Sequence, residues 1–331
     1  MPAPEAMTAA RAGGLTQSRW FGAALKAALT LALLGVVFWR VDPRAVLASL
    51  SSARPLPLAM AFVWVAIAIL VSAIKWGRIL SRRGIRVSLL ELTRLYYIAS
   101  FFNAVLPTSV GGDPVRAWML GREKANMPEA FASIVSERLI ASVALGLSSV
   151  IGLPFVGVTP KLAAFVAAFL VVDAGLVALF LVPRMGERIV RAVIPPRFDG
   201  AASATRSALA AVRDTLTDWP LVAEILLLTL AFQACVAMVN HSLFSAVGEP
   251  VSIGMALLYS PMISTVSMLP VSLSGLGVPQ AAYAYFFGLS GISAPAAVAV
   301  SLGFFLVVAL STVPGAVAFV LARKRGETDG V

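Results

Sequence analysis

Residues 106–114 read Leu106-Pro107-Thr108-Ser109-Val110-Gly111-Gly112-Asp113-Pro114, and they end an apolar stretch that begins at Leu89. A second segment reads Leu269-Pro270-Val271-Ser272-Leu273-Ser274-Gly275-Leu276-Gly277-Val278-Pro279, and it ends an apolar stretch that begins at Ile253. Both segments share a Leu-Pro pair, a Ser/Gly turn and a further proline. Proline disrupts the interior of a helix but is tolerated in its first turn. Each segment therefore predicts an apolar helix, a break and a new helix.

The composition is typical of an integral membrane protein. Of the 331 residues, 59% are hydrophobic and only 13% are charged, whereas soluble domains carry about 25% charged residues. One cysteine and one histidine exclude a disulfide framework and multi-histidine metal centres, and we expect no cofactor. The net charge of +10 comes from Lys and Arg at the ends of apolar stretches. Such residues orient a membrane protein and contact anionic lipid rather than nucleic acid.

Six stretches are apolar over about the 20 residues that a spanning helix needs. They cover residues 20–39, 57–74, 139–156, 161–181, 220–244 and 294–321. The two Leu-Pro stretches, 89–106 and 253–269, are predicted to enter the membrane and return without crossing it, although they are long enough to span. The predicted fold is an all-α polytopic membrane protein with about six full transmembrane helices and two re-entrant hairpins.

The distribution of Lys and Arg predicts the orientation. These residues concentrate in 75–94, 184–219 and 323–325, and positively charged loops lie on the cytoplasmic side. Both termini are then cytoplasmic, and we expect the protein in the bacterial cytoplasmic membrane. Had 89–106 crossed the membrane, the basic residues that follow it would lie outside. The two hairpins therefore enter from opposite sides, which makes them an inverted repeat typical of transporter sites near the membrane midplane.

The sequence predicts one membrane domain over residues 19–322. Residues 1–18 are expected to be a disordered cytoplasmic segment, and 323–331 a basic cytoplasmic tail. Within 184–219, apolar residues at helical spacing alternate with arginines. This pattern predicts an amphipathic helix that lies on the membrane surface.

The break after the first helix suits an anionic group. Backbone that leaves helical geometry in a membrane has unpaired N–H and C=O groups, which are tolerated only against protein or a wet cavity. Asp113 as N-cap and Pro114 as first residue would start a helix whose positive end faces the break. Arg116 in its first turn either adds a bidentate fork for phosphate or is an ordinary cytoplasmic arginine. The second break offers serine hydroxyls and glycine N–H groups in the same way.

Other polar residues have more than one interpretation. Asp173, near the centre of its predicted helix, is either a possible coupling carboxylate or a buried structural aspartate. Glu137 and Arg138 point about 100° apart on a helix and so do not pair ideally with each other. Gln233 and Asn240 share one helical face, which favours hydrogen bonds between helices.

A basic face is predicted where the second spanning helix leaves the membrane. Lys75, Arg78, Arg82 and Arg86 follow helical spacing there. Such a face contacts anionic lipid, with each charge contributing about 1 kcal/mol. Orientation of the helix also explains these charges, and both explanations can hold.

Three motifs occur in order along the chain: Asn103-x-x-Leu106-Pro107-x-x-x-Gly111-Gly112-Asp113-x-x-Arg116, Glu137-Arg138-Leu139, and Leu269-Pro270-x-Ser272-x-x-Gly275-Leu276-Gly277. Together they resemble the flippase-like family related to the transmembrane region of lysylphosphatidylglycerol synthase, over about residues 20–322. The resemblance implies a domain that moves a lipid across the bilayer, and we expect the synthase domain of bifunctional relatives to be absent. Gln280 stands where relatives often have glutamate. The candidate substrate-binding residues are Asn103, Ser109, Gly111, Gly112, Asp113, Arg116, Glu137, Arg138, Ser272, Ser274, Gly275, Gly277 and Gln280.

Three functions are compatible with these features. The first is a flippase for a lipid with a phosphate-bearing or otherwise polar headgroup, such as a phospholipid, a polyprenyl-linked lipid or a lipid of the hopanoid pathway. The second is an accessory subunit of a lipid synthase or glycosyltransferase. The third is an embedded lipid-modifying enzyme, for which Asp113 and Glu137 are the only acid–base candidates. We expect no enzymatic activity and membrane lipids as the binding partners.

Overall fold

The computed structural model describes residues 42–105, 111–123, 127–182, 188, 199–268 and 277–324. Its helices are α2 (Pro43–Ser51), α3 (Pro55–Arg82), α4 (Leu89–Val105), α5 (Gly112–Glu123), α6 (Met127–Gly152), the 3-10 turn η1 (Leu153–Phe155), α7 (Pro160–Leu181), α9 (Asp199–Thr217), α10 (Trp219–Ala246), α11 (Ile253–Ser267), α12 (Val278–Gly288), α13 (Ala294–Ser311) and α14 (Val313–Lys324). The described residues contain helices and turns but no strand. The predicted all-α fold is confirmed.

Prolines and short polar residues mark the starts of the long helices. Proline occupies the first turn of α3, α7, α10 and α13, where its missing N–H removes no intrahelical hydrogen bond. The Thr159 hydroxyl accepts a hydrogen bond from the Leu162 N–H at 3.3 Å and caps α7. The Asp218 carboxylate accepts one from the Leu221 N–H at 3.2 Å and caps α10. These caps satisfy N–H groups that a helix start leaves unpaired.

Within the described part of the chain, five helical segments are long and apolar enough to cross a membrane. They are Pro55–Arg82, Met127–Phe155, Pro160–Leu181, Trp219–Ala246 and Ala294–Ala322. Each overlaps one of the predicted spans, which confirms a polytopic membrane fold. The predicted span 20–39 lies outside the described residues, and the total number of crossings stays a prediction.

The antiparallel pair of α3 and α10 forms the most extensive helix contact. At one end, the Arg54 N–H donates a hydrogen bond to Ala246 O at 2.9 Å. At the other end, Arg78 Nε lies 3.1 Å from Glu224 Oε1. The helix α6 packs against both members of the pair. The three helices therefore form the scaffold against which the shorter helices pack.

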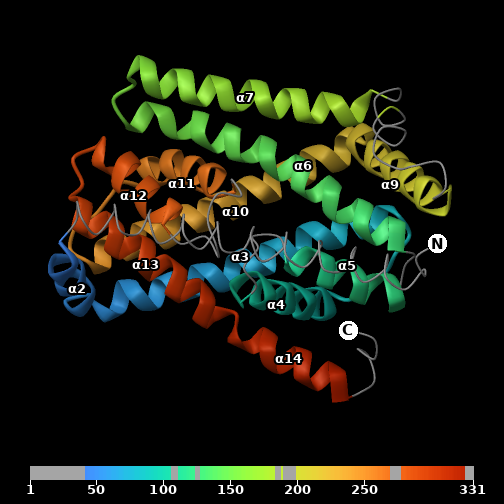
Figure 1. Cartoon of the computed structure of the whole chain (residues 1–331), viewed down its shortest axis with the longest axis horizontal. Coiled ribbons are helices and arrows are strands. Elements are labelled where there is room, and N and C mark those ends of the chain that lie inside the picture. The colour runs from blue at the N-terminus through green and yellow to red at the C-terminus, as the bar shows by residue number, and fades with distance from the viewer. Residues whose placement is uncertain are drawn as a thin grey trace, which may run out of the picture.

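The two broken helices lie in opposite halves of the molecule. The helices α4 and α5 form one hairpin, and α11 and α12 form the other. In Figure 1 the first hairpin lies on the same side as α9, whereas the second lies toward α2. The connecting residues 106–110 and 269–276 are outside the described part. Two hairpins that enter a membrane from opposite sides would lie in this way. Their placement in a membrane stays a prediction.

Gly112 permits the close packing of the first hairpin. A Cβ atom at this position would lie only 1.9 Å from the backbone oxygen of Ala99. The start of α5 therefore rests directly on the backbone of α4, and only glycine fits there. This contact gives a structural reason for the second glycine of the Gly-Gly-Asp motif.

The predicted single helix 294–321 is divided in two. The helix α13 ends at Ser311, and α14 begins at Val313 with Pro314 in its first turn. The Pro314 ring has no N–H to continue the helical ladder, which explains the break. Beyond it, α14 packs against α4, and a Cβ at Gly315 would lie 2.0 Å from Tyr97 O.

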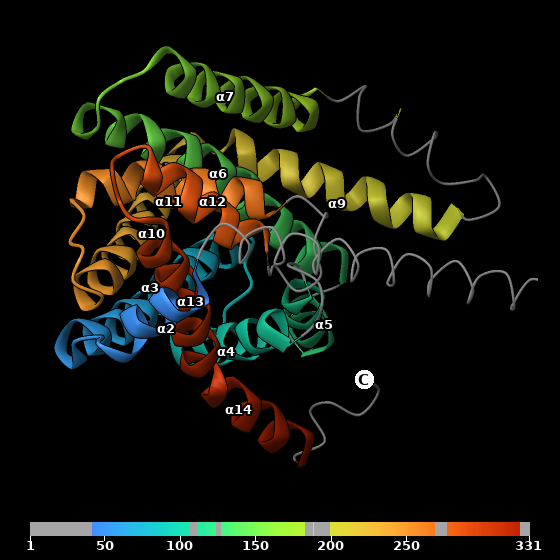
Figure 2. The same ribbon diagram turned by 60° about the vertical axis from the view of Figure 1, so that its left-hand side comes forward.

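The amphipathic helix predicted within 184–219 does not expose its apolar face. The helix α9 covers Asp199–Thr217, and its Val212 and Leu216 are buried with Leu139 and Ile140 of α6. The apolar side of α9 thus packs on protein rather than on lipid, because α6 offers a matching apolar surface. Figure 2 shows α7 at the edge of the molecule, beyond α6.

Candidate functional site

A network of five charged side chains lies between α3, α5 and α6. Lys75 Nζ of α3 lies 3.1 Å from Glu137 Oε1 of α6. Arg116 Nη1 of α5 lies 3.0 Å from Glu137 Oε2. Asp113 of α5 accepts from Arg116 Nη2 at 3.0 Å and from Arg138 Nε at 2.9 Å. Three cations thus surround two carboxylates, so the network has a formal charge of +1.

Arg116 is at the centre of this network and is fully buried. Its exposed fraction is 1%. Its Nε and Nη2 donate to Asp113 Oδ1, and its Nη1 donates to Glu137 Oε2. The guanidinium also lies 4.9 Å from the Trp76 ring centroid and 4.6 Å from that of Tyr96. Of the two interpretations of Arg116, a free fork for phosphate does not fit this arrangement, because each guanidinium nitrogen already donates to a carboxylate.

Glu137 is the other centre of the network. Besides Lys75 and Arg116, its carboxylate accepts a hydrogen bond from the Tyr96 hydroxyl at 2.5 Å. The side chain is 6% exposed. Removing a charged residue from water is unfavourable unless it is paired, and these three partners supply the pairing. Glu137 therefore pairs with two cations and joins α3, α4, α5 and α6.

The predicted basic face on the second spanning helix is not continuous. Lys75 is buried at 4% exposure and points to Glu137 instead of the membrane surface. Arg78 and Arg82 pair with Glu224 and Asp218. Arg86 follows the end of α3 at Arg82, so it lies outside the helical register. The sequence pattern placed these four residues on one face. In the structure, Lys75 pairs with a carboxylate of α6, whereas Arg78 and Arg82 pair with carboxylates at and near the start of α10.

Arg138 has the most accessible guanidinium of the network. Its Nε and Nη2 donate to the two oxygens of Asp113 at 2.9 and 3.0 Å. Its side chain is nevertheless 50% exposed. Among the described residues, Nη1 has no hydrogen-bond partner. Asp113 therefore holds Arg138 in place while one of its donors remains available.

The start of α5 differs from the predicted one. The helix begins at Gly112, so Asp113 lies inside the first turn and is not the N-cap. The Asn103 side chain of α4 accepts the hydrogen bond from the Gly112 N–H at 2.7 Å. Asn103 thus satisfies a donor that was expected to bind substrate. Gly111 directly precedes the helix, and Ser109 lies outside the described residues.

The network lines a cavity of about 330 Å³, here called the charged cavity. Its wall includes all five charged side chains. Thr229 and Gln233 of α10 line it on another side. The cavity therefore presents a net positive charge together with neutral polar groups.

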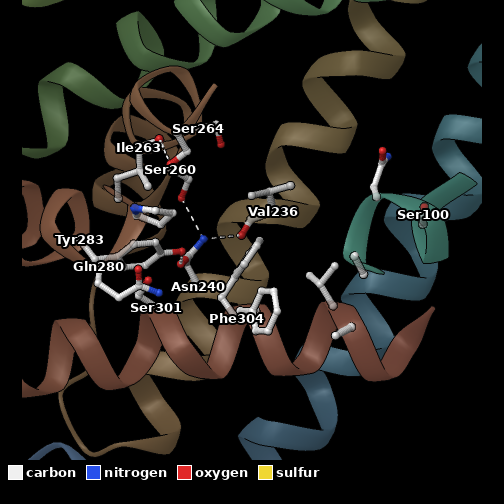
Figure 3. Close-up of a pocket in the computed structure, with 17 residues that line it drawn as sticks. Ser100, Val236, Asn240, Ser260, Ile263, Ser264, Gln280, Tyr283, Ser301 and Phe304 are labelled. Carbon is white, nitrogen blue, oxygen red and sulfur yellow. Dashed lines mark hydrogen bonds between the residues drawn. The ribbon is translucent and has the colours of Figure 1, made fainter. Parts of the chain in front are cut away.

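A second cavity of about 390 Å³, here called the neutral cavity, is lined by polar but uncharged side chains together with apolar ones. Asn240 lies at its centre in Figure 3. The Asn240 amide donates to Ser260 Oγ at 3.0 Å and accepts from the Tyr283 hydroxyl at 2.6 Å. The predicted interhelical hydrogen bonds of Asn240 are confirmed, since they join α10, α11 and α12. The roles of Tyr283 and Ser301 in this wall were not predicted, because both lie singly in apolar helices.

The two cavities adjoin each other. Five residues line both: Ser100, Asn103, Val236, Ser264 and Phe304. The flanks of the two hairpins also meet at the neutral cavity, whose lining includes Asn103 and Ala104 of α4 and Pro279 and Gln280 of α12. Parts of both broken helices thus border these two adjoining cavities.

Of the second Leu-Pro segment, the structure describes only the residues from Gly277 onward. Gly277 has a positive φ of 93°, which favours glycine. Its N–H donates to Gln280 Oε1 at 2.6 Å, so Gln280 caps α12 and also lines the neutral cavity. Three further candidates, Ser272, Ser274 and Gly275, lie outside the described residues.

Asp173 is separate from both cavities. It is buried at 5% exposure on α7, a helix that packs mainly on α6 and α9. Its Oδ2 has no hydrogen-bond partner among the described residues. Asp173 is not among the residues lining either cavity, and this position favours a structural role.

These features define a polytopic helical membrane protein with a cationic cavity between its helices. The family model of the lysylphosphatidylglycerol synthase TM region matches residues 23–315, so the chain belongs to this family. The chain is also similar to a UPF0104 membrane protein of Methanothermobacter thermautotrophicus. The two are 24% identical over 274 residues, which cover 76% of this chain and 81% of the relative.

Proposed function

We propose that the protein carries a lipid with a phosphate-bearing headgroup across the membrane. The observation that supports this function is the network with a formal charge of +1 on the wall of the charged cavity. Charged residues inside a membrane protein are unfavourable and usually mark a pathway or a site for a charged ligand. Family membership supports the same function.

Arg138 is the proposed contact for the phosphate. Its Nη1 has no partner among the described residues, and its side chain is half exposed on the cavity wall. Arginine binds phosphate through charge-assisted hydrogen bonds. Asp113 acts as the positioning residue, because it holds the other two guanidinium nitrogens. Lys75 adds a second positive charge to the wall.

The two broken helices supply the proposed route. Their flanks border the neutral cavity, and the hairpins lie in opposite halves of the molecule (Figure 1). Pairs of interrupted helices in this arrangement are typical of transporters, in which one part rocks against another around a central site. A headgroup in the cavities would therefore be reached alternately from the two membrane surfaces.

The test is transport by purified protein in phosphatidylcholine vesicles that contain a fluorescent phosphatidylglycerol. Wild-type protein should move the probe from the inner to the outer leaflet, where a quencher added outside the vesicles reaches it. Arg138→Ala should slow transport at least about tenfold, since a charge-assisted hydrogen bond contributes roughly 1.5–3 kcal/mol. Arg138→Lys should restore only part of the rate, because lysine lacks the planar fork.

Arg78→Ala is the matched control, since Arg78 pairs with Glu224 and lines neither cavity. It should transport as wild type does. Unchanged transport by Arg138→Ala would contradict the proposed role of Arg138. Absence of transport by the purified chain would favour the accessory-subunit function with a synthase or glycosyltransferase partner. Mass spectrometry of the recovered lipid should show no covalent change, and a modified lipid would favour the enzymatic alternative.

A further inference from the structure

The neutral cavity contains polar groups that have no hydrogen-bond partner among the residues the structure describes. Ser301 of α13 is 3% exposed, and its hydroxyl has no hydrogen-bond partner among the described residues. Two other buried serines donate to a backbone carbonyl one turn earlier: Ser136 to Ala132 O and Ser149 to Leu145 O. An unpaired buried hydroxyl is unfavourable, so a ligand in the cavity would improve its environment.

Two more groups on this wall are available. Gln280 uses its Oε1 to accept from Gly277, and no hydrogen bond of its Nε2 occurs among the described residues. Ser264 lines both cavities. Together with Ser301, these side chains offer donors and acceptors that suit hydroxyl groups. The rings of Tyr283 and Phe304 supply an apolar surface beside them.

The charges restrict what can bind. None of the described residues that line the neutral cavity is Asp, Glu, Lys, Arg or His. The two carboxylates of the charged cavity are already paired with three cations. Among the described residues of both cavities, a headgroup with an ammonium group would therefore find no free carboxylate. A headgroup with an anionic phosphate and an uncharged polar extension matches both.

We propose that the neutral cavity binds the uncharged, hydroxyl-bearing part of the lipid headgroup, a glycerol or a sugar, while the phosphate lies at Arg138. This inference rests on the proposed lipid-carrier function and specifies the substrate class. The five residues shared by the cavities place the two subsites next to each other. Their volumes of about 390 and 330 Å³ are in the range of small-ligand sites.

Three short-chain lipids with the same acyl groups separate the contributions of the phosphate, the hydroxyl groups and an amine to binding. Phosphatidic acid has the phosphate alone, phosphatidylglycerol adds hydroxyl groups, and phosphatidylethanolamine adds an amine. Binding to detergent-purified full-length protein is measured by calorimetry, and transport is measured in vesicles with fluorescent forms of the same lipids. Wild type should bind phosphatidylglycerol more tightly than phosphatidic acid, and phosphatidylethanolamine most weakly.

Ser301→Ala should reduce the preference for phosphatidylglycerol over phosphatidic acid by about two- to tenfold, the usual effect of one hydrogen bond. Ser301→Leu should remove the preference by filling the cavity and leave the binding of phosphatidic acid near wild type. Ser311→Ala is the matched control, because the Ser311 hydroxyl on the same helix is also buried and unpaired among the described residues but lines neither cavity. Melting temperatures identify a variant that fails to fold.

Equal binding of phosphatidylglycerol and phosphatidic acid by wild type, or a preference that survives Ser301→Leu, would overturn the inference. Transport of both lipids at equal rates would also overturn the inference about the neutral cavity, but it would agree with the proposed carrier function. Absence of transport with the binding preference intact would instead remove the carrier function and retain the subsite.

Discussion

At the scale of single residues, the environment of an arginine decides its role. Arg116 and Arg138 both bind Asp113, yet their exposed side-chain fractions are 1% and 50%. Arg116 is enclosed by Trp76, Tyr96 and Glu137, whereas Arg138 lies on a cavity wall. The first is therefore a structural centre of the network, and the second is its available donor.

Arg116→Ala should destabilise the protein by about 3–5 kcal/mol, because removing one member of a buried ion pair leaves uncompensated charge. Both Asp113 and Glu137 would lose a partner. Thermal unfolding of the purified protein in detergent measures the effect. Arg78→Ala removes a more exposed ion pair and should change stability by about 0–1 kcal/mol. Equal shifts in the two variants would contradict the structural role of Arg116.

At the scale of elements, the first hairpin depends on contact between backbones. Gly112 rests on Ala99 of α4, and Asn103 of the same helix caps α5 through the Gly112 N–H. These contacts fix the start of α5 and thereby the positions of Asp113 and Arg116. The Gly-Gly-Asp motif thus orients the ion-pair network, and Gly112 is needed for packing.

Gly112→Ala should destabilise the protein by at least about 3 kcal/mol, near the upper end for overpacking. The reason is that the new Cβ would clash with the backbone of α4, which cannot move away as a flexible side chain can. Gly175→Ala on α7 is the matched control, since nothing lies within 4 Å of a Cβ there. That change should stabilise the helix by up to about 1 kcal/mol. Size-exclusion chromatography and melting in detergent compare the variants. A Gly112→Ala protein that melts as wild type does would show that α4 and α5 are not in contact.

At the scale of the whole molecule, the two hairpins lie in opposite halves and flank one region of cavities (Figure 1). The antiparallel pair of α3 and α10 passes beside both of them. The helices α2 and α9 lie at opposite ends of the molecule in the same view. The charge distribution predicts that the α9 end is cytoplasmic.

Cysteine labelling tests this orientation. In a Cys235→Ala background, which removes the one buried native thiol, Ala48→Cys on α2 should react with an impermeant maleimide in intact cells. Ala210→Cys on α9 should react only after permeabilisation. Both positions are exposed, so accessibility within the protein does not limit the reaction. Labelling of residue 210 from outside would reverse the orientation and with it the cytoplasmic placement of the termini.

The class of protein and most helices follow from the sequence, because both depend on local properties. A run of about 20 apolar residues predicts a span wherever it occurs, and five of the predicted spans overlap candidate spans in the structure. The chemistry of proline likewise predicts a division of each Leu-Pro stretch into two helices, and the described pairs α4 and α5, and α11 and α12, agree with it. Candidate residues of the motifs, such as Asn103, Asp113 and Glu137, do meet at one cavity.

The pairing of these residues was decided only by the tertiary structure. Tyr96 and Glu137 are 41 residues apart in the chain, and Asp113 and Arg138 are 25 apart. Helical periodicity relates residues a few positions apart, so it could not show that Lys75 turns inward to Glu137. It also could not show that Arg116 is enclosed while Arg138 remains accessible, since burial depends on helices that pack from distant parts of the chain.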